Sequence, residues 1–185
     1  MNRFYLAFAF LTVLIYAHSI VWGFRSSPHR SPLQFVLLAA IFIIWVGAIY
    51  IGFCSSLPSI SFQITGGFVS ILSLALFFYA HSQHRAHKPC KAFSFEEPSD
   101  FVTSGPYRHI RHPIYVAYLL SVAAFGIYSL NPFFAASFVV LFVLYTIAAA
   151  REEQTFLSSV HRDAYKNYMR SSGRFLPKFH ATNVA

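Results

Sequence analysis

The stretch Thr103–Leu120, TSGPYRHIRHPIYVAYLL, changes from polar to apolar within a few residues. Two Arg-His pairs lie within Arg108–His112, and a hydrophobic run begins at Pro113. Proline is favoured at the first position of a helix, because its missing N–H would have no intrahelical acceptor there. The stretch therefore predicts an apolar helix whose N-terminal mouth gathers cationic and imidazole side chains.

The composition around this stretch is that of an integral membrane protein. Of the 185 residues, 56% are hydrophobic and 11% are charged, whereas a soluble domain carries about 25% charged residues. The mean hydropathy is +0.53, and the length suits one domain over residues 1–185. The net charge is +8, but the basic residues lie between the hydrophobic runs. That pattern is typical of membrane loops and gives no reason to expect a nucleic-acid partner.

Five hydrophobic segments predict an all-α, polytopic membrane helix bundle, since a bilayer core takes about 20 helical residues. With five crossings, Arg3 is the only Lys or Arg on one side, and the three segments on the other side hold two, five and six. Because positive residues favour the cytoplasmic side, we expect a cytoplasmic C-terminus and an N-terminus on the opposite side. The predicted segments are Phe4–Trp22, Leu33–Phe53, Ile64–Ala80, Ile114–Ser129 and Phe133–Ala150.

A further, amphipathic helix is predicted after the fifth segment. Apolar side chains recur every four residues from Phe156 to Tyr168, and Arg162, Lys166 and Arg170 form the opposite face. The apolar stripe suits a helix in the cytoplasmic membrane interface, and it equally suits a helix packed against the bundle. Within the third segment, the pair Gly66–Gly67 is expected to permit close helix packing.

The short connection Ser129–Pro132 is expected to bring the polar residues of segments four and five together. Asn131 is a good N-cap for the fifth segment, and proline follows it. So short a turn makes segments four and five antiparallel neighbours. The mouth of segment four then meets Arg151–Glu153, at the end of segment five, at one face of the membrane. Basic groups, imidazoles, a phenol and two carboxylates converge there.

Other interpretations of this rim are open. Lys and Arg at a membrane edge snorkel and bind anionic lipid heads, so a non-enzymatic lipid-binding protein is one alternative. A membrane reductase with a nicotinamide cofactor is another, although no Gly-rich dinucleotide fingerprint is present. His81, His84 and His87, with Cys90, lack the tight spacing of a tetrahedral zinc site, so no metal is expected.

The order of residues over about Ser99–Lys178 resembles a known family. The relevant sequences are FVTSGPYRHIRHPIY, then a helical hairpin, then REEQTFLSSVHRDAYKNYMRSSGRFLP. An Arg-His-Pro-x-Tyr motif at a membrane mouth, followed by an acidic pair after the hairpin, resembles the isoprenylcysteine carboxyl methyltransferase and phospholipid methyltransferase family. Ala117 stands where that family usually has Gly.

The resemblance implies transfer of a methyl group from S-adenosylmethionine. In such enzymes the loop before the Arg-His-Pro motif wraps the cofactor, while the motif and the acidic pair contact it. Counting back from Tyr165 favours Glu153 over Glu152 as the cofactor-binding carboxylate. The matching positions are Asp100, Phe101, Val102, Tyr107, His112, Pro113, Ile114, Tyr115, Glu152 and Glu153.

The residue types suit this reaction on their own chemistry. Carboxylates accept hydrogen bonds from an ammonium or from ribose hydroxyls, and a helix N-terminus attracts a carboxylate. His112 and Tyr115 lie three residues apart, on one helix face. Methyl transfer depends on positioning, and Arg151 or Arg111 is expected to aim an anionic acceptor. We therefore expect a membrane methyltransferase that works among lipids on an amphiphilic acceptor: an isoprenylcysteine carboxylate, a lipid amine or a thiol.

Overall fold

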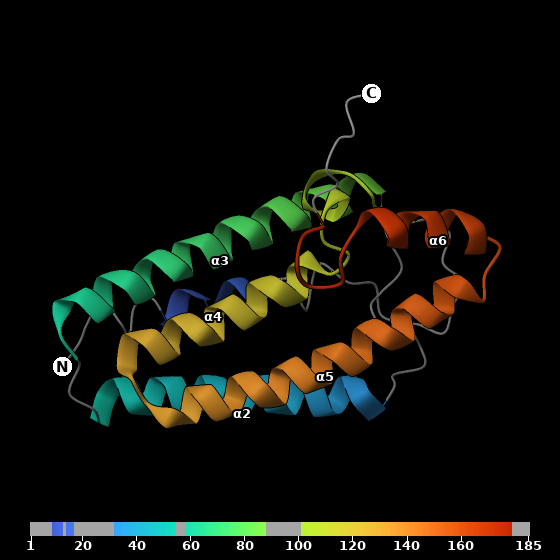
Figure 1. The fold of residues 1–185 in the computed structure, drawn as a ribbon. Coiled ribbons are helices and arrows are strands. Elements are labelled where there is room, and N and C mark those ends of the chain that lie inside the picture. Colours follow the sequence, from blue (N-terminus) through green and yellow to red (C-terminus); the bar gives the residue numbers. More distant parts are fainter. Residues whose placement is uncertain (1–8, 13, 17–31, 55–57, 88–100, 179–185) are drawn as a thin grey trace.

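The computed structural model describes residues 9–12, 14–16, 32–54, 58–87 and 101–178. These residues are mainly helical, and an isolated bridge between Ile110 and Gly173 is the one β-type pairing among them. Figure 1 shows α2, α3, α4 and α5 running along the long axis, with α6 and η1 at one end. The elements are α2 (Pro32–Cys54), α3 (Ile60–His87), η1 (Gly105–Arg108), α4 (Pro113–Ser129), α5 (Pro132–Leu157) and α6 (Arg162–Ser171).

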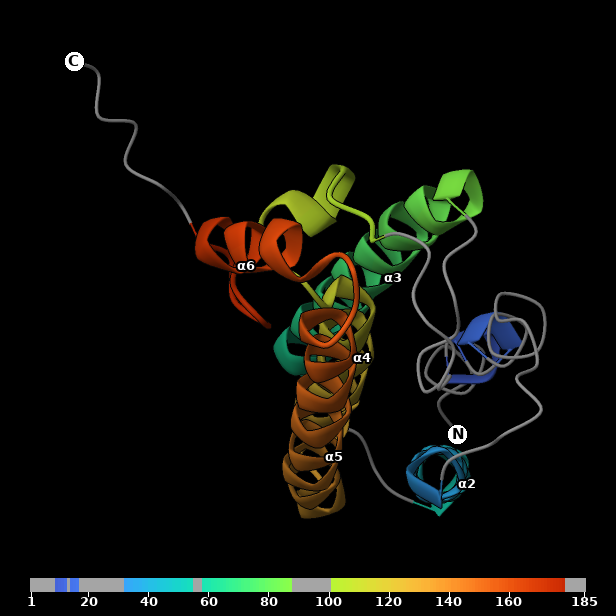
Figure 2. The same ribbon diagram turned by 90° about the vertical axis from the view of Figure 1, so that its right-hand side faces the viewer.

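Three of the helices are long and apolar enough to cross a membrane: α2, α3 and α5. α4 is apolar and has 17 residues, which is the lower end of the usual spanning length of about 17–25. The predicted all-α membrane bundle is therefore confirmed. Of the first predicted segment, only residues 9–12 and 14–16 are described, and they are helical. Figure 2 shows α6 on one side of α4 and α5, and this stretch on the other.

The hairpin between α4 and α5 forms as predicted. Leu130 ends α4 in a left-handed conformation with φ of 50°, and its N–H bonds the carbonyl of Gly126. Asn131 then caps α5, since its Oδ1 accepts from the N–H of Phe133 at 3.0 Å, and Pro132 takes the first helical position. The two helices are thereby antiparallel, and the start of α4 lies beside the C-terminal half of α5 (Figure 1).

Small residues bring α3 and α4 into close contact. A Cβ on Gly66 would lie 2.9 Å from the backbone oxygen of Ala124, so the predicted close packing is confirmed at this glycine. Gly67 has nothing within 4 Å of the equivalent position. Further along, Ser73 donates to the carbonyl of Ala117 at 2.7 Å, and Ala117 is fully buried. Ala117 therefore occupies a helix contact with little spare room.

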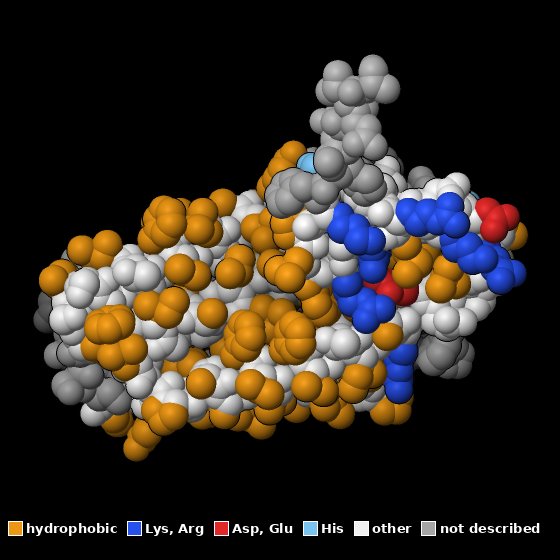
Figure 3. Space-filling view, viewed as in Figure 1, with side chains coloured by type: hydrophobic (Ala, Val, Ile, Leu, Met, Phe, Trp, Pro, Cys, Tyr) orange, Lys and Arg blue, Asp and Glu red, His pale blue; other side chains and the backbone are white. Residues whose placement is uncertain are grey.

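The core consists of two clusters of buried apolar side chains, both of which contact Trp45 and Tyr118. Outside the core, large apolar side chains cover the long helices, as in Figure 3. The same view shows Lys and Arg gathered at the end of the bundle that carries α6. An apolar flank with a basic end is the surface expected of a bundle that lies in a bilayer and meets water at that end.

The predicted amphipathic helix is present, but a turn divides its sequence. α5 continues past the apolar run to Leu157, a turn follows over residues 158–161, and α6 begins at Arg162. Val160 lies in that turn and is 87% exposed, so the apolar stripe is interrupted there. Tyr165 is buried on the bundle side of α6, whereas Lys166 is exposed. α6 therefore packs against the bundle through part of its predicted stripe.

Candidate active site

Six polar side chains from three segments meet where α4 begins and α5 ends. Two precede α4, one lies in its first turn, two lie on α5, and one belongs to the chain after α6. We refer to them as the polar cluster. Its members are Arg111, His112, Tyr115, Glu152, Glu153 and Arg174. The sequence predicted five of the six, and their contacts bring both elements of the resemblance, the Arg-His-Pro-x-Tyr motif and the acidic pair, into one place.

Glu153 is the centre of the polar cluster, and its side chain is 3% exposed. Its Oε1 accepts from Arg111 Nε at 2.8 Å and from Arg174 Nε at 3.1 Å. A second donor of Arg174 bonds Oε2, and His112 Nε2 lies 3.4 Å from Oε1. A buried carboxylate is costly unless it is paired and hydrogen-bonded, and here two guanidinium groups and an imidazole surround it.

Glu152 has a different environment, because its side chain is 21% exposed. Tyr115 donates its hydroxyl to one carboxylate oxygen, and His112 Nδ1 lies 3.3 Å from the other. No arginine is among its described partners. The two neighbouring carboxylates thus differ: Glu153 is enclosed, whereas Glu152 keeps an open side.

His112 joins the two carboxylates. Its ring stacks on that of Tyr115, with centroids 5.4 Å apart and an interplanar angle of 2°. Burial of the imidazole lowers its pKa, but the hydrogen bonds and charges of Glu152 and Glu153 outweigh this effect, so the pKa is raised from 6.5. The imidazolium form is therefore favoured, with Nδ1 beside Glu152 and Nε2 beside Glu153.

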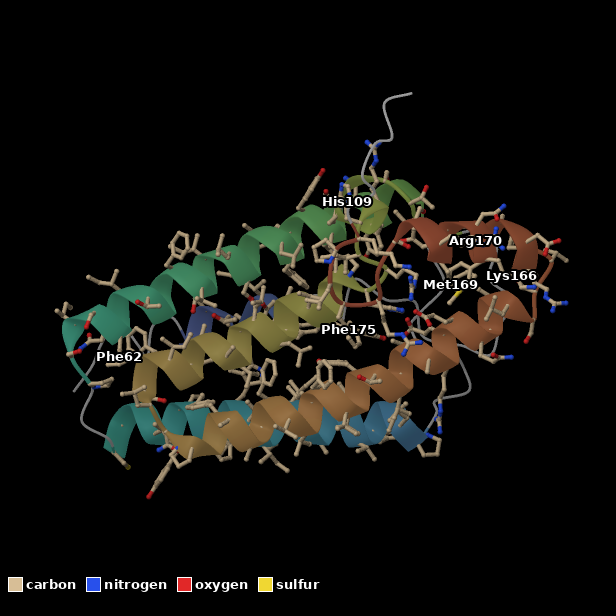
Figure 4. The ribbon with its side chains drawn as sticks, viewed as in Figure 1. Phe62, His109, Lys166, Met169, Arg170 and Phe175 are labelled. Atoms are coloured by element: carbon tan, nitrogen blue, oxygen red, sulfur yellow. The ribbon has the colours of Figure 1, made fainter. Side chains whose placement is uncertain are left out.

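The chain after α6 closes over the mouth of α4 as a tail strap, residues 172–178. The N–H of Arg111 bonds the carbonyl of Gly173 at 2.8 Å, and the N–H of His112 bonds that of Arg174 at 3.2 Å. In the opposite direction, the N–H of Gly173 bonds the carbonyl of His109 at 3.0 Å. Figure 4 places Phe175, also in the tail strap, between α4 and α5.

The tail strap explains the arrangement of two arginines. The guanidinium of Arg111 bonds the carbonyl of Ser172 as well as Glu153, so its position depends on the strap. Arg174, which the sequence analysis did not select, belongs to the strap and supplies the second cation for Glu153. A buried carboxylate needs more than one hydrogen-bond donor, and this requirement could have pointed to a second arginine. The sequence alone, however, did not show that Glu153 is buried.

The predicted cofactor loop lies against this site. Asp100 falls outside the described residues. Phe101 packs edge-on against Tyr165, with ring centroids 5.2 Å apart, and is inclined to Tyr168 at 5.4 Å. The hydroxyl of Tyr168 donates to the carbonyl of Tyr107 at 2.6 Å, and burial raises the pKa of Tyr168 to about 12, so the phenol stays a neutral donor. α6 thereby holds the loop beside the polar cluster.

The remaining predicted residues divide into buried and exposed groups. Val102, Pro113 and Ile114 are buried, and Val102 and Ile114 belong to the same core cluster as Tyr107. Arg151 is exposed on α5, and its guanidinium forms no hydrogen bond or ion pair with the polar cluster among the described residues. The structure therefore places Arg111 inside the cluster and Arg151 outside it, at the edge of the bundle.

Comparison with known proteins assigns this arrangement to a family. The chain is 35% identical over 77 residues to the cobalt-zinc-cadmium resistance protein CzcN of Cupriavidus metallidurans; the match covers 42% of this chain and about a third, 35%, of that protein. The family model for phospholipid methyltransferase matches residues 61–164, which extend from the start of α3 into α6 and make up more than half of the chain. The chain therefore belongs to the phospholipid methyltransferase family of membrane methyltransferases.

Proposed function

We propose that the protein transfers a methyl group from S-adenosylmethionine to an amphiphilic acceptor that enters from the bilayer. The observation that carries this proposal is the unequal pair of carboxylates, Glu152 and Glu153, beside the first turn of α4. A family of methyltransferases matches the chain over these elements. Because the family is that of phospholipid methyltransferases, a phospholipid is the first acceptor to test.

The chemistry of the polar cluster fits such a cofactor. Glu152 has an exposed side and can accept from an ammonium or a ribose hydroxyl. His112 gives α4 no side-chain cap, so the N–H groups of Ile114 and Tyr115 remain without intrahelical acceptors and suit a carboxylate. When bound, S-adenosylmethionine supplies a methyl group on a sulfonium centre.

The roles of the two carboxylates follow from their partners. Glu153 is enclosed by Arg111 and Arg174, so we assign it to holding the mouth of α4 and the tail strap in register. Glu152, held by Tyr115 and His112, is the carboxylate we assign to direct cofactor contact. This choice differs from the sequence analysis, in which the spacing to Tyr165 favoured Glu153 as the cofactor-binding carboxylate.

Arg151 is the candidate for contact with the acceptor. Its guanidinium is always charged, can grip a phosphate or carboxylate at two points, and is exposed at the edge of the bundle. Arg111 fits this role less well, because its donors are used by Glu153 and Ser172. We propose that Arg151 positions the anionic part of the acceptor at the membrane boundary.

The test is calorimetry with S-adenosylhomocysteine on detergent-solubilised protein. Glu152→Gln should weaken binding by about 10- to 150-fold, the loss expected for a hydrogen bond to a charged group. Arg151→Ala should leave affinity within a few-fold and remove most turnover, because an untethered acceptor is misaligned. Wild-type protein that does not bind would overturn the proposed use of this cofactor. Unchanged affinity in Glu152→Gln would refute its assigned contact.

A further inference from the structure

Two buried hydroxyl groups inside the bundle have no hydrogen-bond partner among the described residues: those of Tyr118 on α4 and Tyr145 on α5. The nearby hydroxyls of Tyr16 and Ser73 are paired, since they lie 2.7 Å apart and Ser73 also donates to the carbonyl of Ala117. A buried hydroxyl without a partner is destabilising, and most such groups are paired. Two of them on adjacent helices point to a ligand.

The two tyrosines lie directly inward of the polar cluster. The ring of Tyr145 stacks on that of Tyr115, with centroids 4.6 Å apart, and lies 6.0 Å from that of Tyr118. Tyr115 itself donates to Glu152. Because α4 begins and α5 ends at the polar cluster, Tyr118 lies about one helical turn and Tyr145 about two turns into the membrane. Both hydroxyls therefore lie on the membrane side of the polar cluster.

The surroundings of the hydroxyls are aromatic and uncharged. The ring of Tyr118 lies 4.6 Å from that of Tyr16 and 5.9 Å from that of Phe77. The guanidinium groups of Arg111 and Arg174 are committed to Glu153. A charged group would therefore lack a counter-ion beside the two hydroxyls, whereas an uncharged acceptor of hydrogen bonds would satisfy them. The ester carbonyls of glycerolipids are such atoms, and they lie just inside the head groups of a bilayer.

We propose that Tyr118 and Tyr145 donate hydrogen bonds to the ester carbonyl oxygens of a glycerolipid acceptor. This inference rests on the proposed function, because it assigns the acceptor side of the same site. The two tyrosines then set specificity, since the prenyl chain of an isoprenylcysteine carries no carbonyl oxygen.

The test uses purified protein in phosphatidylcholine nanodiscs, with two acceptors of identical head group and chain length. One is dioleoyl phosphatidylethanolamine, and the other is its diether analogue, which lacks the carbonyl oxygens. Wild-type protein should show an acceptor KM about 2- to 10-fold lower for the diester, the range expected for a neutral hydrogen bond. Tyr118→Phe and Tyr145→Phe should each raise the KM for the diester and leave that for the diether unchanged. Tyr50→Phe, at an exposed position on α2, is the matched control.

Several outcomes would overturn the assignment. They are equal KM values of wild-type protein for diester and diether, a preference that survives in both variants, and an absence of methylation of either lipid. A merely structural role would change the KM for both lipids alike. The melting temperature of each variant, expected unchanged or raised, measures any loss of folding. S-adenosylhomocysteine binding in the same nanodiscs is measured separately, so its failure identifies a failure of the proposed function itself.

Discussion

At the scale of single residues, His112 determines how the polar cluster responds to pH. Its pKa is raised above the value of 6.5 expected in the unfolded chain, because the carboxylates of Glu152 and Glu153 outweigh the effect of burial. A raised pKa means that the folded state binds the proton more tightly than the unfolded state does. The stabilisation is therefore complete below pH 6.5 and is lost as the pH rises through the higher pKa of the folded protein.

We expect the melting temperature of detergent-solubilised protein to fall as the pH rises above about 6.5, through loss of this proton. His112→Gln should flatten that dependence, because the titrating group is gone. Glu152→Gln should reduce it, because the imidazolium loses one of its two carboxylates. Thermal unfolding followed by intrinsic fluorescence gives the slope of the melting temperature against pH for each protein. A slope identical in wild-type and His112→Gln protein would show that the imidazole does not stabilise the fold in this way.

At the scale of helices, the contact between α3 and α4 is tested by two adjacent glycines. Alanine at either position gains about 0.5–1 kcal/mol of helix propensity. At Gly66 the new Cβ would lie 2.9 Å from the carbonyl of Ala124 and from the Cβ of Tyr128, so the helices must separate. Gly67→Ala meets nothing within 4 Å and is the matched control. Gly66→Ala should be less stable than Gly67→Ala by about 1–3 kcal/mol, the usual cost of overpacking.

Equilibrium unfolding in mixed detergent micelles measures this difference in stability. The rates of methyl transfer by the two variants show whether the contact between α3 and α4 affects the candidate active site. Ser73, farther along α3, bonds the carbonyl of Ala117, so separation of the helices would displace the part of α4 next to Tyr118. Equal stability of the two alanine variants would mean that α3 and α4 do not pack as closely as described.

The helices also show which parts of the structure the sequence could predict. Apolar run length located α2, α3, α4 and α5, and the capped turn at Asn131 predicted that Glu152 and Glu153 would reach the start of α4. The bounds of α3 and α5 were underestimated, because hydropathy ends at the membrane boundary whereas helical hydrogen bonding continues to His87 and Leu157.

The tail strap could not be predicted in the same way. Its bonds join the backbone before α4 to residues after α6, and they have no periodicity in the sequence. Arg174 was therefore missed, and the enclosure of Glu153 with it. Similarly, the apolar stripe after Phe156 predicted one helix, whereas a turn over residues 158–161 lets α6 fold back so that Tyr165 packs on Phe101.

At the scale of the whole molecule, charge and hydropathy separate along the long axis. The exposed cations among the described residues lie near the polar cluster and α6, while apolar side chains cover the rest (Figure 3). Cys54 ends α2 at the opposite end of the bundle (Figure 1) and is exposed. Since the thirteen Lys and Arg expected on one side contrast with Arg3 on the other, the positive-inside rule predicts that the candidate site faces the cytoplasm and that Cys54 lies on the opposite side.

The two native cysteines make this orientation measurable. In intact cells, a membrane-impermeant maleimide should label Cys54 in a Cys90→Ser variant, because an exposed thiol at that end faces away from the cytoplasm. In a Cys54→Ser variant, Cys90 should react only after permeabilisation, since the sequence places it among the basic residues between the third and fourth segments. Labelling of denatured protein controls for thiol reactivity. Labelling of Cys90 but not Cys54 in intact cells would mean that the bundle has the opposite orientation, and that its site opens away from the cytoplasmic supply of S-adenosylmethionine.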